Sequence, residues 1–584
     1  MRVFFLLLLQ QLLLRVESYQ IPHTRSKQMP QAEPQDPLRY FASCAAGLEE
    51  ILATELSGVH VRASRVRLGT RGVEFDGDTG TGYRALLWVR TANRVLELLA
   101  DERDGINSAD ALYAMTRECV DWRYYLSESG TLGVDTVLGN TGPDLRHSHF
   151  CALTVKNAIV DQFREASRDG QGRPSVDPHD PDLPVVAYLH RGGATLYRSL
   201  GGTGSLHKRG YRGGGGGGGN NVGKGSRRSG AAMHAASLRE TLAAGILLMA
   251  GWPERCDHAY RASSEALLLD PMCGSGTIAI EAALIARGVA PGLLRLGLFS
   301  GGEAAESSGE LREGECGSNR QFAVQRFLDV ESDVWRASVR EAVAAVRGKS
   351  SSSGHVDFFH VMANDWHPGA LKLGRTDAEA AGVARDITFS EYDAADWHLR
   401  VSSDGFESPG NDAADTSRST MVVSNPPWDL RIGGADEAWS TLGQLLRRES
   451  YHCSDAWFLC GNADVTRHLR MKAARRRPIT SGGVDLRLLH YKVLPPKVAP
   501  TQSHPEATGA RAQNLLLEHD SAPEVDGAIL ERGPLEEIRG SLSEEDYWSL
   551  TIPKLKDELR LRGLKVSGRK GELIKRLLRK EEAA

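Results

Sequence analysis

The sequence predicts an α/β protein whose central domain is a doubly wound parallel sheet, with an α+β region before it and a small helical hairpin after it. Three observations support this fold class. Residues 238–495 alternate short apolar runs with amphipathic segments, as strands and helices do in a parallel sheet. Residues 39–200 mix both patterns without that alternation, and residues 541–584 carry two amphipathic runs around a glycine turn. At 584 residues the chain is also too long for one hydrophobic core.

The α+β region begins near Arg39. Residues 39–56 predict a strand, a turn and a helix, because Leu48, Ile51, Leu52 and Leu56 follow helical spacing. The other predicted elements are a strand at 72–78, a helix or helix–strand at 83–99, a long helix at 145–167, and a β-hairpin around Gly192 and Gly193.

The central domain is predicted from seven elements. They are helix 238–252, strand 266–270, helix 276–288, strand 357–365, helix 368–382, strand 387–393 and strand 420–427. Residues 300–320, 348–354 and 401–419 are rich in glycine and serine and predict surface insertions. Seven consecutive glycines, Gly213–Gly219, predict a flexible linker or insertion over residues 201–237.

Composition is that of a globular protein, with 41% hydrophobic and 25% charged residues. The net charge of −4 excludes a polycation, so nucleic acid would have to bind at local basic patches. The eight cysteines form no CxxC pair and no zinc-like cluster with histidine. We interpret them as free thiols of a reducing compartment and predict no metal site.

The run "LLLDPMCGSGTIAIEAAL" joins an apolar strand ending at Asp270 to a glycine loop and a helix. Such a loop brings a ligand close to the backbone, and the free N–H groups of the helix N-terminus favour an anion. The pattern is DxxxGxG, so it lacks the third glycine of a dinucleotide fingerprint. An acid before the loop suits an ammonium group, and S-adenosylmethionine carries both an ammonium and a carboxylate. The candidate cofactor-binding residues here are Asp270, Met272, Cys273, Gly274, Gly276 and Thr277.

Two further acids follow predicted strands. Asp365 ends "VMAND" and is a candidate to accept both ribose hydroxyls of an adenosyl group, with helix capping as the alternative. It lies far along the chain from the glycine loop, and we attribute most of that excess to an insertion over residues 301–354. Asp393, in "SEYDAADW", is a candidate for the adenine amino group, and Asp396 competes for that role.

The stretch "SNPPWDL" follows the last predicted strand. The lone pair of an amino group on a nucleic-acid base is drawn into the ring, so the group is a poor nucleophile and must be oriented. The Asn425 side-chain oxygen and the Pro426 carbonyl could accept its two hydrogens, and Pro427 stiffens the turn. Trp428 could stack on the base. These four residues are the candidate catalytic set, acting by positioning the amine.

The motifs "FASCAAGLEEILATEL", "GVEFDGD", "HSHFCALTVKNAIVDQF", "LHKRGYR", "ETLAAGILLMAGW", "DPMCGSGTIAIEAA" and "NPPW" together resemble the bacterial 23S ribosomal RNA guanine-N2 methyltransferases that carry a THUMP domain. The resemblance spans residues 39 to about 493. It implies a ferredoxin-like piece, a THUMP domain and a Rossmann-like class I methyltransferase domain that uses S-adenosyl-L-methionine. Asp365 and Asp393 match the family aspartates. Trp428 departs from the usual tyrosine, and only Arg431 remains of a Gly-Glu-Arg pattern.

The tail from Leu550 to Leu578 resembles a SAP domain, a helical hairpin that binds nucleic acid. Between Trp548 and Lys580 it has 11 Lys or Arg residues against 3 Asp or Glu residues. This basic patch predicts salt-dependent binding to a nucleic-acid backbone. The candidate RNA-binding residues are Arg146, Lys156, Lys208, Arg212, Lys565, Arg569 and Lys570.

The expected domains, by residue range, are 1–18 signal-peptide-like, 19–38 disordered or transit-like, 39–110 ferredoxin-like, 111–200 THUMP, 201–237 glycine-rich linker or insertion, 238–495 methyltransferase, 496–540 linker and 541–584 SAP. The expected function is methylation of the guanine N2 amine in large-subunit ribosomal RNA. A transfer RNA guanine-N2 methyltransferase and a non-catalytic RNA-binding ribosome-assembly factor stay open as alternatives.

Residues 1–18 have the apolar run and polar exit of a secretory signal peptide, and the run from Val3 to Leu14 is short for a bilayer span. Free cysteines and an RNA-modifying fold do not suit a secretory lumen. A plastid reached through the secretory route reconciles both features. A mitochondrial address fits less well, because Val3–Leu14 lacks spaced arginines. We expect no stable membrane association once this segment is removed.

Overall fold

The computed structural model describes residues 37–167, 172–212, 238–299, 322–347, 358–397, 419–428, 434–448 and 455–494, with Leu559, Ile574 and Leu577. The chain divides into two compact units, Met1–Val498 and Ala499–Ala584. The signal-like segment, the glycine run, most of the predicted insertions, and Lys565, Arg569 and Lys570 lie outside the described residues. Within the described residues, no helix is long and apolar enough to cross a membrane.

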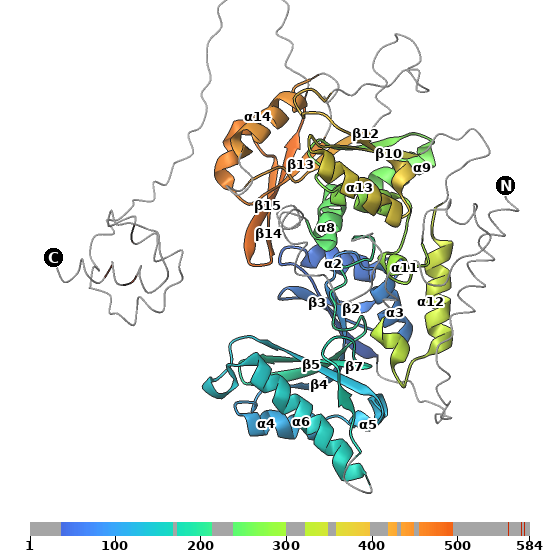
Figure 1. The fold of residues 1–584 in the computed structure, drawn as a ribbon, viewed down its shortest axis with the longest axis vertical. Helices are drawn as coiled ribbons and strands as arrows, with labels where there is room; N and C mark the ends of the chain where they lie inside the picture. Colours follow the sequence, from blue (N-terminus) through green and yellow to red (C-terminus); the bar gives the residue numbers. More distant parts are fainter. Residues whose placement is uncertain are drawn as a thin grey trace, which may run out of the picture. The chain divides into compact units, whose positions relative to one another are not determined.

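The first part of unit one has the ferredoxin-like order of elements (Figure 1, blue). These are β1 (Leu38–Ser43), α2 (Glu49–Ser57), β2 (Ser64–Gly69), β3 (Gly72–Gly77), α3 (Thr79–Trp88) and β4 (Arg94–Glu102). The strands lie in the order β2-β3-β1-β4, and every neighbouring pair is antiparallel. Asp78 fixes the start of α3, because its carboxylate accepts a hydrogen bond from Thr81 N at 2.6 Å. The predicted strand, turn and helix within 39–56 and the strand at 72–78 are confirmed, and of the two alternatives for 83–99 the structure has the helix–strand.

The following elements extend the same sheet. They are α4 (Ala109–Glu118), α5 (Trp122–Tyr125), β5 (Thr131–Leu138), η1 (Pro143–Leu145), α6 (Ser148–Ala166), β6 (Ser175–Val176), β7 (Leu183–His190) and β8 (Gly193–Ser199). Because β8 pairs with β4, one eight-stranded sheet runs through the ferredoxin-like and THUMP-like parts. The long helix and the hairpin are confirmed, and Arg191 and Gly192 adopt positive φ at the hairpin turn.

The second sheet is the predicted doubly wound one (Figure 1, green to orange). Its strands are β9 (Ala266–Asp270), β10 (Phe359–Asn364), β11 (Ile387–Ser390), β12 (Ser419–Ser424), β13 (Asp455–Cys460), β14 (Arg475–Ser481) and β15 (Val484–Lys492). They lie in the order β11-β10-β9-β12-β13-β15-β14. The first five are parallel, whereas β15 runs antiparallel to both of its neighbours. The strand order reverses between β9 and β12, which is where ligands bind in such sheets.

The helices and short turns of this part are α8 (Glu240–Ala250), α9 (Trp252–Ala262), α10 (Thr277–Ala286), α11 (Pro291–Arg295), η2 (Ala323–Arg326), α12 (Ser332–Ala344), α13 (Pro368–Ala380), η3 (Ala384–Asp386), α14 (Ala435–Leu446) and η5 (Ala463–Leu469). Helix α10 is buried on all sides and apolar throughout except for Thr277 and Glu281. The apolar run from Thr277 to Ala286 therefore forms a core helix and not an amphipathic surface helix.

Two expectations about irregular segments were wrong. Part of the supposed insertion at 301–354 forms α12, which packs on α3 through an edge-to-face contact of Trp335 with Tyr83 at 5.5 Å between ring centroids. Part of the supposed linker at 201–237 also belongs to the fold, because Arg209 and Tyr211 are 2% exposed. Sequence pattern missed both, since their partners lie far away along the chain.

Candidate methyl-transfer site

The motifs predicted for cofactor and acceptor meet at one edge of the second sheet. The carboxyl ends of β9, β10, β11 and β12 all lie at this edge, because these four strands are parallel. Ser424, the last residue of β12, donates a hydrogen bond from its hydroxyl to Asp270 Oδ1 at 2.6 Å. The acceptor motif, which begins at Asn425, is therefore tied to the start of the glycine loop.

Asp270 lies beneath the glycine loop and is 1% exposed. Its Oδ1 also accepts a hydrogen bond from Met272 N at 3.3 Å. Burial raises the pKa of Asp270 to about 7, the two hydrogen bonds oppose this shift, and the negative charge of Asp365 adds to it. The carboxyl group thus changes charge near neutral pH and is stabilised as an anion by any cation that approaches it.

The loop from Cys273 to Gly276 is shaped by two glycines in the left-handed region. Gly274 has φ +55° and Gly276 has φ +70°, which side chains rarely adopt. A Cβ on Gly276 would lie 3.0 Å from Phe389, whereas a Cβ on Gly274 would meet no atom within 4 Å. The backbone at Gly274 therefore faces open space, and Gly276 begins helix α10.

Asp365 follows β10 and holds the loop. Its Oδ2 accepts a hydrogen bond from Gly274 N at 2.8 Å, and its Oδ1 accepts one from His367 N at 2.9 Å. Each carboxylate oxygen has a second lone pair, so Asp365 retains acceptor capacity for ribose hydroxyls. The structure thus joins two candidates that lie 91 residues apart in sequence.

Asn364 was missed by the sequence reading and joins three of the loops at this edge. It is fully buried, and its amide donates to the carbonyl oxygens of Pro271 at 3.1 Å and Tyr392 at 3.0 Å. Its oxygen accepts from the Ser390 hydroxyl and from Tyr392 N. Its backbone carbonyl accepts from Cys273 N at 2.8 Å. In the sequence, an asparagine directly before Asp365 at the end of an apolar strand is the signal that could have identified it.

Asp393 and Asp396 lie in the exposed turn after β11. Asp393 Oδ1 accepts from Ala395 N at 2.8 Å, and its backbone carbonyl accepts from Asp396 N at 2.9 Å. Both carboxylates thus lie at the correct edge of the sheet. The choice between them as the adenine contact stays a prediction.

The acceptor motif is rigid in the structure. Trp428 donates from its indole N–H to Asn425 Oδ1 at 3.1 Å, and Trp439 of α14 donates to the Pro427 carbonyl at 2.9 Å. A Cβ on Gly461 would lie 2.3 Å from the Trp428 ring, so the indole packs directly on that glycine. The role that the structure gives Trp428 is to hold Asn425. Its stacking on a base stays a prediction.

Arg212, a predicted RNA contact, has protein partners instead. Its guanidinium pairs with Glu240 at 3.4 Å and donates a hydrogen bond to the Thr277 hydroxyl at the start of α10. Behind it, Arg209 pairs with Glu281 at 3.0 Å, and the Tyr211 hydroxyl donates to the same Glu281 oxygen at 3.0 Å. The segment "KRGYR" therefore packs against α10 and binds Thr277 and Glu281 of this helix.

The other RNA candidates in the described residues are accessible. Arg146 and Lys208 are exposed and Lys156 is half-buried. Arg146 precedes α6 and Lys156 lies on it, on the same helix as Phe150, 48% exposed, and Leu153, 42% exposed. Exposed apolar and basic groups on one helix suit an RNA surface, and binding by these residues stays a prediction.

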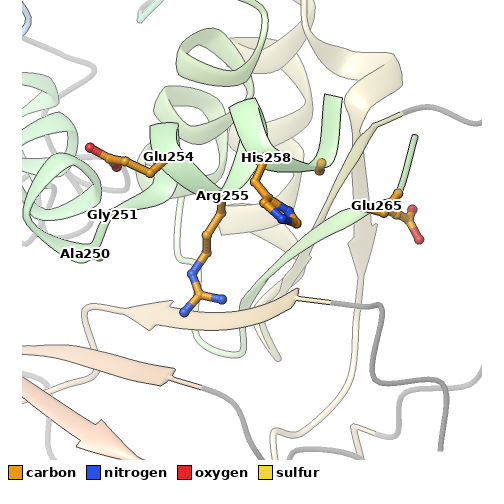
Figure 2. Close-up of a pocket in the computed structure, with 8 residues that line it drawn as sticks. Ala250, Gly251, Glu254, Arg255, His258 and Glu265 are labelled. Carbon is orange, nitrogen blue, oxygen red and sulfur yellow. The ribbon is translucent and has the colours of Figure 1, made fainter. Parts of the chain in front are cut away.

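A hollow of about 370 Å³ lies elsewhere, between α8, α9 and the start of β9 (Figure 2). It is lined by Ala250, Gly251, Glu254, Arg255, His258, Ala259, Ser264 and Glu265. Arg255 bonds to Asp455 from this side. The hollow is at the amino end of β9, opposite Asp270, so it does not belong to the methyl-transfer edge. No cluster of three or more metal-ligating side chains occurs in the described part of the chain.

Family models match four segments of the chain. They describe an RlmL ferredoxin-like domain at residues 39–96, a THUMP domain at 107–198, an RMKL-like methyltransferase domain at 227–490 and a SAP domain at 546–579. The ferredoxin-like and THUMP models fall on the two parts of the eight-stranded sheet. The methyltransferase model covers the doubly wound sheet up to residue 490 in β15, and it includes both motifs at the edge of the sheet.

Relatives named ribosomal RNA large subunit methyltransferase K/L match over most of the chain. The protein of Syntrophotalea carbinolica is 32% identical over 460 residues, which are 78% of this chain and 54% of the relative. The protein of Chromohalobacter salexigens is 31% identical over 519 residues, 87% of this chain and 59% of the relative. The chain thus spans about half the length of the curated relatives it matches.

Solved structures share the fold. The SMU.472 protein complexed with SAH has a TM-score of 0.57 at 19% identity, over 80% of this chain and 100% of that protein. A protein of Clostridium difficile 630 described as a possible methylase has a TM-score of 0.57 at 21% identity, with the same coverage. Residues 227–490 thus match the RMKL-like methyltransferase domain, and in this chain that domain is joined to segments that match RlmL ferredoxin-like, THUMP and SAP domains.

Proposed function

We propose that the protein is an S-adenosyl-L-methionine-dependent RNA methyltransferase that modifies the exocyclic N2 amine of a guanine in large-subunit ribosomal RNA. The observation that carries the proposal is the hydrogen bond from Ser424 to Asp270 at 2.6 Å. It places the acceptor motif beside the cofactor loop, at the point where the strand order reverses. Methyl donor and acceptor can meet only where these two motifs adjoin.

The residues at the edge fit the cofactor. The open backbone at Gly274 leaves room for a ligand, and Asp270 offers a carboxyl group that a neighbouring ammonium would hold ionised. Asp365 has lone pairs left for the ribose, and Asp393 or Asp396 is accessible for the adenine amine. When bound, the cofactor supplies a methyl group activated by its sulfonium.

The acceptor motif of the chain orients the guanine amine. Asn425 Oδ1 keeps one lone pair after the Trp428 hydrogen bond, and it can accept one amine hydrogen. The Pro426 carbonyl accepts no hydrogen bond from the described residues, so it can accept the other amine hydrogen. Both acceptors are preordered by Trp428 and Trp439, which lowers the entropy lost on binding. The lone pair of the amine is thereby directed toward the cofactor side.

The choice of RNA rests on the accessory domains and the named relatives. THUMP and SAP domains precede and follow the catalytic domain, and the relatives are large-subunit ribosomal RNA methyltransferases by name. The target guanine must be unpaired or flipped to enter the site. A transfer RNA substrate is the alternative within the same chemistry, and a non-catalytic assembly factor is the alternative outside it.

The test is methyl transfer by the purified full chain. Unmodified ribosomal RNA and transfer RNA transcripts would be incubated with the cofactor, digested, and analysed for N2-methylguanosine by mass spectrometry. N2-methylguanosine in ribosomal RNA is the expected result. If it formed in transfer RNA alone, the substrate would be transfer RNA. Cofactor binding by calorimetry without product in either RNA would favour the assembly factor.

We also propose that the protein works in an organelle, a plastid reached through the secretory route. The support is the apolar run Val3–Leu14 combined with six described cysteines that are all free. A fusion of residues 1–40 to a fluorescent protein in an algal host tests it. Signal in the endoplasmic reticulum, the mitochondrion or the cytosol would overturn the plastid assignment and leave the enzymatic one intact.

A further inference from the structure

The β14–β15 hairpin carries a dense group of cations that the motifs do not explain. Between Arg467 and Lys492 the sequence has eight Lys or Arg residues and one acidic residue, Asp485, in a chain of net charge −4. All eight are exposed: Arg467, Arg470, Lys472, Arg475, Arg476, Arg477, Arg487 and Lys492. This concentration makes the hairpin strongly electropositive.

Most of these cations, including three arginines on the two hairpin strands, have no ion-pair or hydrogen-bond partner in the described residues. Arg477 pairs with Glu50 at 3.6 Å, and Asp485 accepts a hydrogen bond from Thr480. For the side chains of Arg475, Arg476 and Arg487, the described part of the chain offers no ion pair or hydrogen bond. We call these three the basic hairpin residues. Their charge is available to an external anion.

The position of the hairpin relates it to the acceptor motif. Ser424 is in register with Phe458 on β13. Because the two strands are parallel, the next residue, Asn425, is level with Leu459. Leu459 pairs with Leu488, and Leu488 pairs with Arg477 on β14. Asn425 and Arg477 are thus at the two ends of one row across the sheet. Three strand spacings separate their backbones, a distance of about 14 Å.

The basic hairpin residues lie close to that row. Arg487 is in register with Cys460, one position further toward the same edge and two strands from β12, about 10 Å away. Arg476 is one position below Arg477 on β14. Arg487 is thus at the edge at which the target base must enter, whereas Arg476 is level with Ser424 and Arg475 is level with Val423, one and two positions further from the row of Asn425.

The positive surface continues toward the other sheet. Thr480 N donates to the Ala46 carbonyl at 2.9 Å, so the hairpin contacts the ferredoxin-like part. A Cβ on Gly482, at the hairpin turn, would lie 3.7 Å from the Arg239 guanidinium. Burial and then the cations Arg239 and Lys208 lower the pKa of His207 to about 4. The hairpin therefore adjoins a second group of cations beside the THUMP-bearing half.

A simpler role also fits part of this pattern. β14 is an edge strand, and exposed arginines with Pro478 prevent such an edge from pairing with another chain. That role requires no cation on β15, which is an interior strand, yet Arg487 is exposed there without a partner. The edge-protection role therefore leaves Arg487 unexplained.

We propose that Arg475, Arg476 and Arg487 bind phosphates of the RNA strand that presents its base to Asn425. The inference rests on the proposed function, because it requires an RNA substrate. Phosphate contacts position a strand without reading its sequence. The hairpin would hold the nucleotides next to the target, while the THUMP and SAP domains hold more distant parts of the RNA.

The experiment compares two triple variants of the full chain with equal loss of charge. The test variant is Arg475→Gln/Arg476→Gln/Arg487→Gln. The control is Arg261→Gln/Arg336→Gln/Arg340→Gln, which removes accessible arginines from α9 and α12. A mixed-sequence stem–loop RNA is the binding probe, with affinity measured across salt concentrations. Calorimetry with the cofactor checks that both variants are folded, and methyl transfer to ribosomal RNA gives kcat and KM.

In the test variant we expect the slope of log affinity against log salt to fall by about two, since each lost phosphate contact lowers it by about 0.7–0.9. KM for RNA should rise about tenfold or more while kcat and cofactor affinity stay unchanged, and the control should match the wild type. An unchanged slope and KM, or an equal loss in the control, would overturn the proposal. If the wild type methylates no RNA, the proposed function fails, and the slope alone still decides whether the hairpin binds phosphate.

Discussion

Helix α10 separates two regions that use charged side chains in opposite ways. At its N-terminus, Asp270 and Asp365 accept hydrogen bonds chiefly from backbone N–H groups and one hydroxyl, and acceptor capacity remains. One turn further along the helix, Glu281 is fully buried and is held by Arg209 and Tyr211. The first region leaves charge available to a ligand, whereas the second neutralises charge within the protein.

This difference separates binding from stability. Arg209 also donates to the Arg90 carbonyl at 2.9 Å, and Arg90 donates to the Val289 carbonyl at 2.8 Å. The ferredoxin-like part is thereby linked to the segment after α10. Changes at the ligand edge should cost activity or affinity and little stability, and changes around Glu281 should cost stability first.

The largest effect is expected from Asn425→Ala at the ligand edge. Loss of a preordered acceptor for the amine should lower kcat by about 10²–10³-fold. Cofactor affinity should stay within about tenfold, or ~1.4 kcal/mol, and the unfolding midpoint should not change. Single-turnover methyl transfer, calorimetry and thermal unfolding measure the three quantities. Gln444→Ala, an exposed amide on α14, is the control. Near-normal turnover in Asn425→Ala would refute the role given to Asn425.

In the second region, Glu281→Ala should leave Arg209 buried without its counter-charge. Removing one partner of a buried ion pair costs about 3–5 kcal/mol of unfolding free energy. Denaturant unfolding measures it, and the exposed Glu254→Ala on α9 should change stability by less than about 0.5 kcal/mol. The double variant Arg209→Met/Glu281→Leu should recover part of the loss, because no charge is then left unpaired. A loss below about 1 kcal/mol in Glu281→Ala would remove the distinction between the two regions.

The two regions also differ in what the sequence could predict. The strand–loop–helix at Asp270–Thr277 and the turn at Asn425 are local patterns. The glycines and prolines that these conformations require are visible in the sequence. The pair Arg209–Glu281 joins residues 72 positions apart, and the bond from Arg90 to Val289 spans 199. Hydrophobic periodicity gives no information about partners so far apart in the sequence. The sequence therefore predicts a linker at "KRGYR". Helix α12 was missed for the same reason, because Tyr83 and Trp335 identify each other only in the fold.

Within the ligand edge, Asp365→Ala separates the binding of the cofactor from the orientation of the amine. The variant loses the ribose acceptor and also the bond that holds Gly274 N. We expect cofactor Kd to rise about 10–100-fold, or ~1.4–2.8 kcal/mol, with kcat at saturating cofactor close to wild type. Isothermal titration with the cofactor measures it, and Asp333→Ala, whose side chain is 96% exposed on α12, is the control. An unchanged Kd would show that another acid binds the ribose.

A pH dependence is also expected at Asp270, whose pKa burial raises to about 7. A free aspartate has a pKa of about 3.9, so between pH 4 and pH 7 the folded protein holds a proton that the unfolded chain has released. The contribution of Asp270 to stability is therefore complete below about pH 4 and is lost as pH rises through about 7.

Cofactor binding should show the opposite trend, because only the carboxylate attracts an ammonium. Affinity should rise by up to tenfold per pH unit until about pH 7 and then level off. Calorimetry on the wild type and on Asp270→Asn separates this group from others that titrate in the same range. The variant should bind more weakly, with a flatter pH profile, and should lose less stability between pH 5 and pH 8. Parallel profiles for the two proteins would mean that Asp270 keeps one charge state throughout this pH range, and an equal affinity in Asp270→Asn would mean that another residue at this edge binds the ammonium.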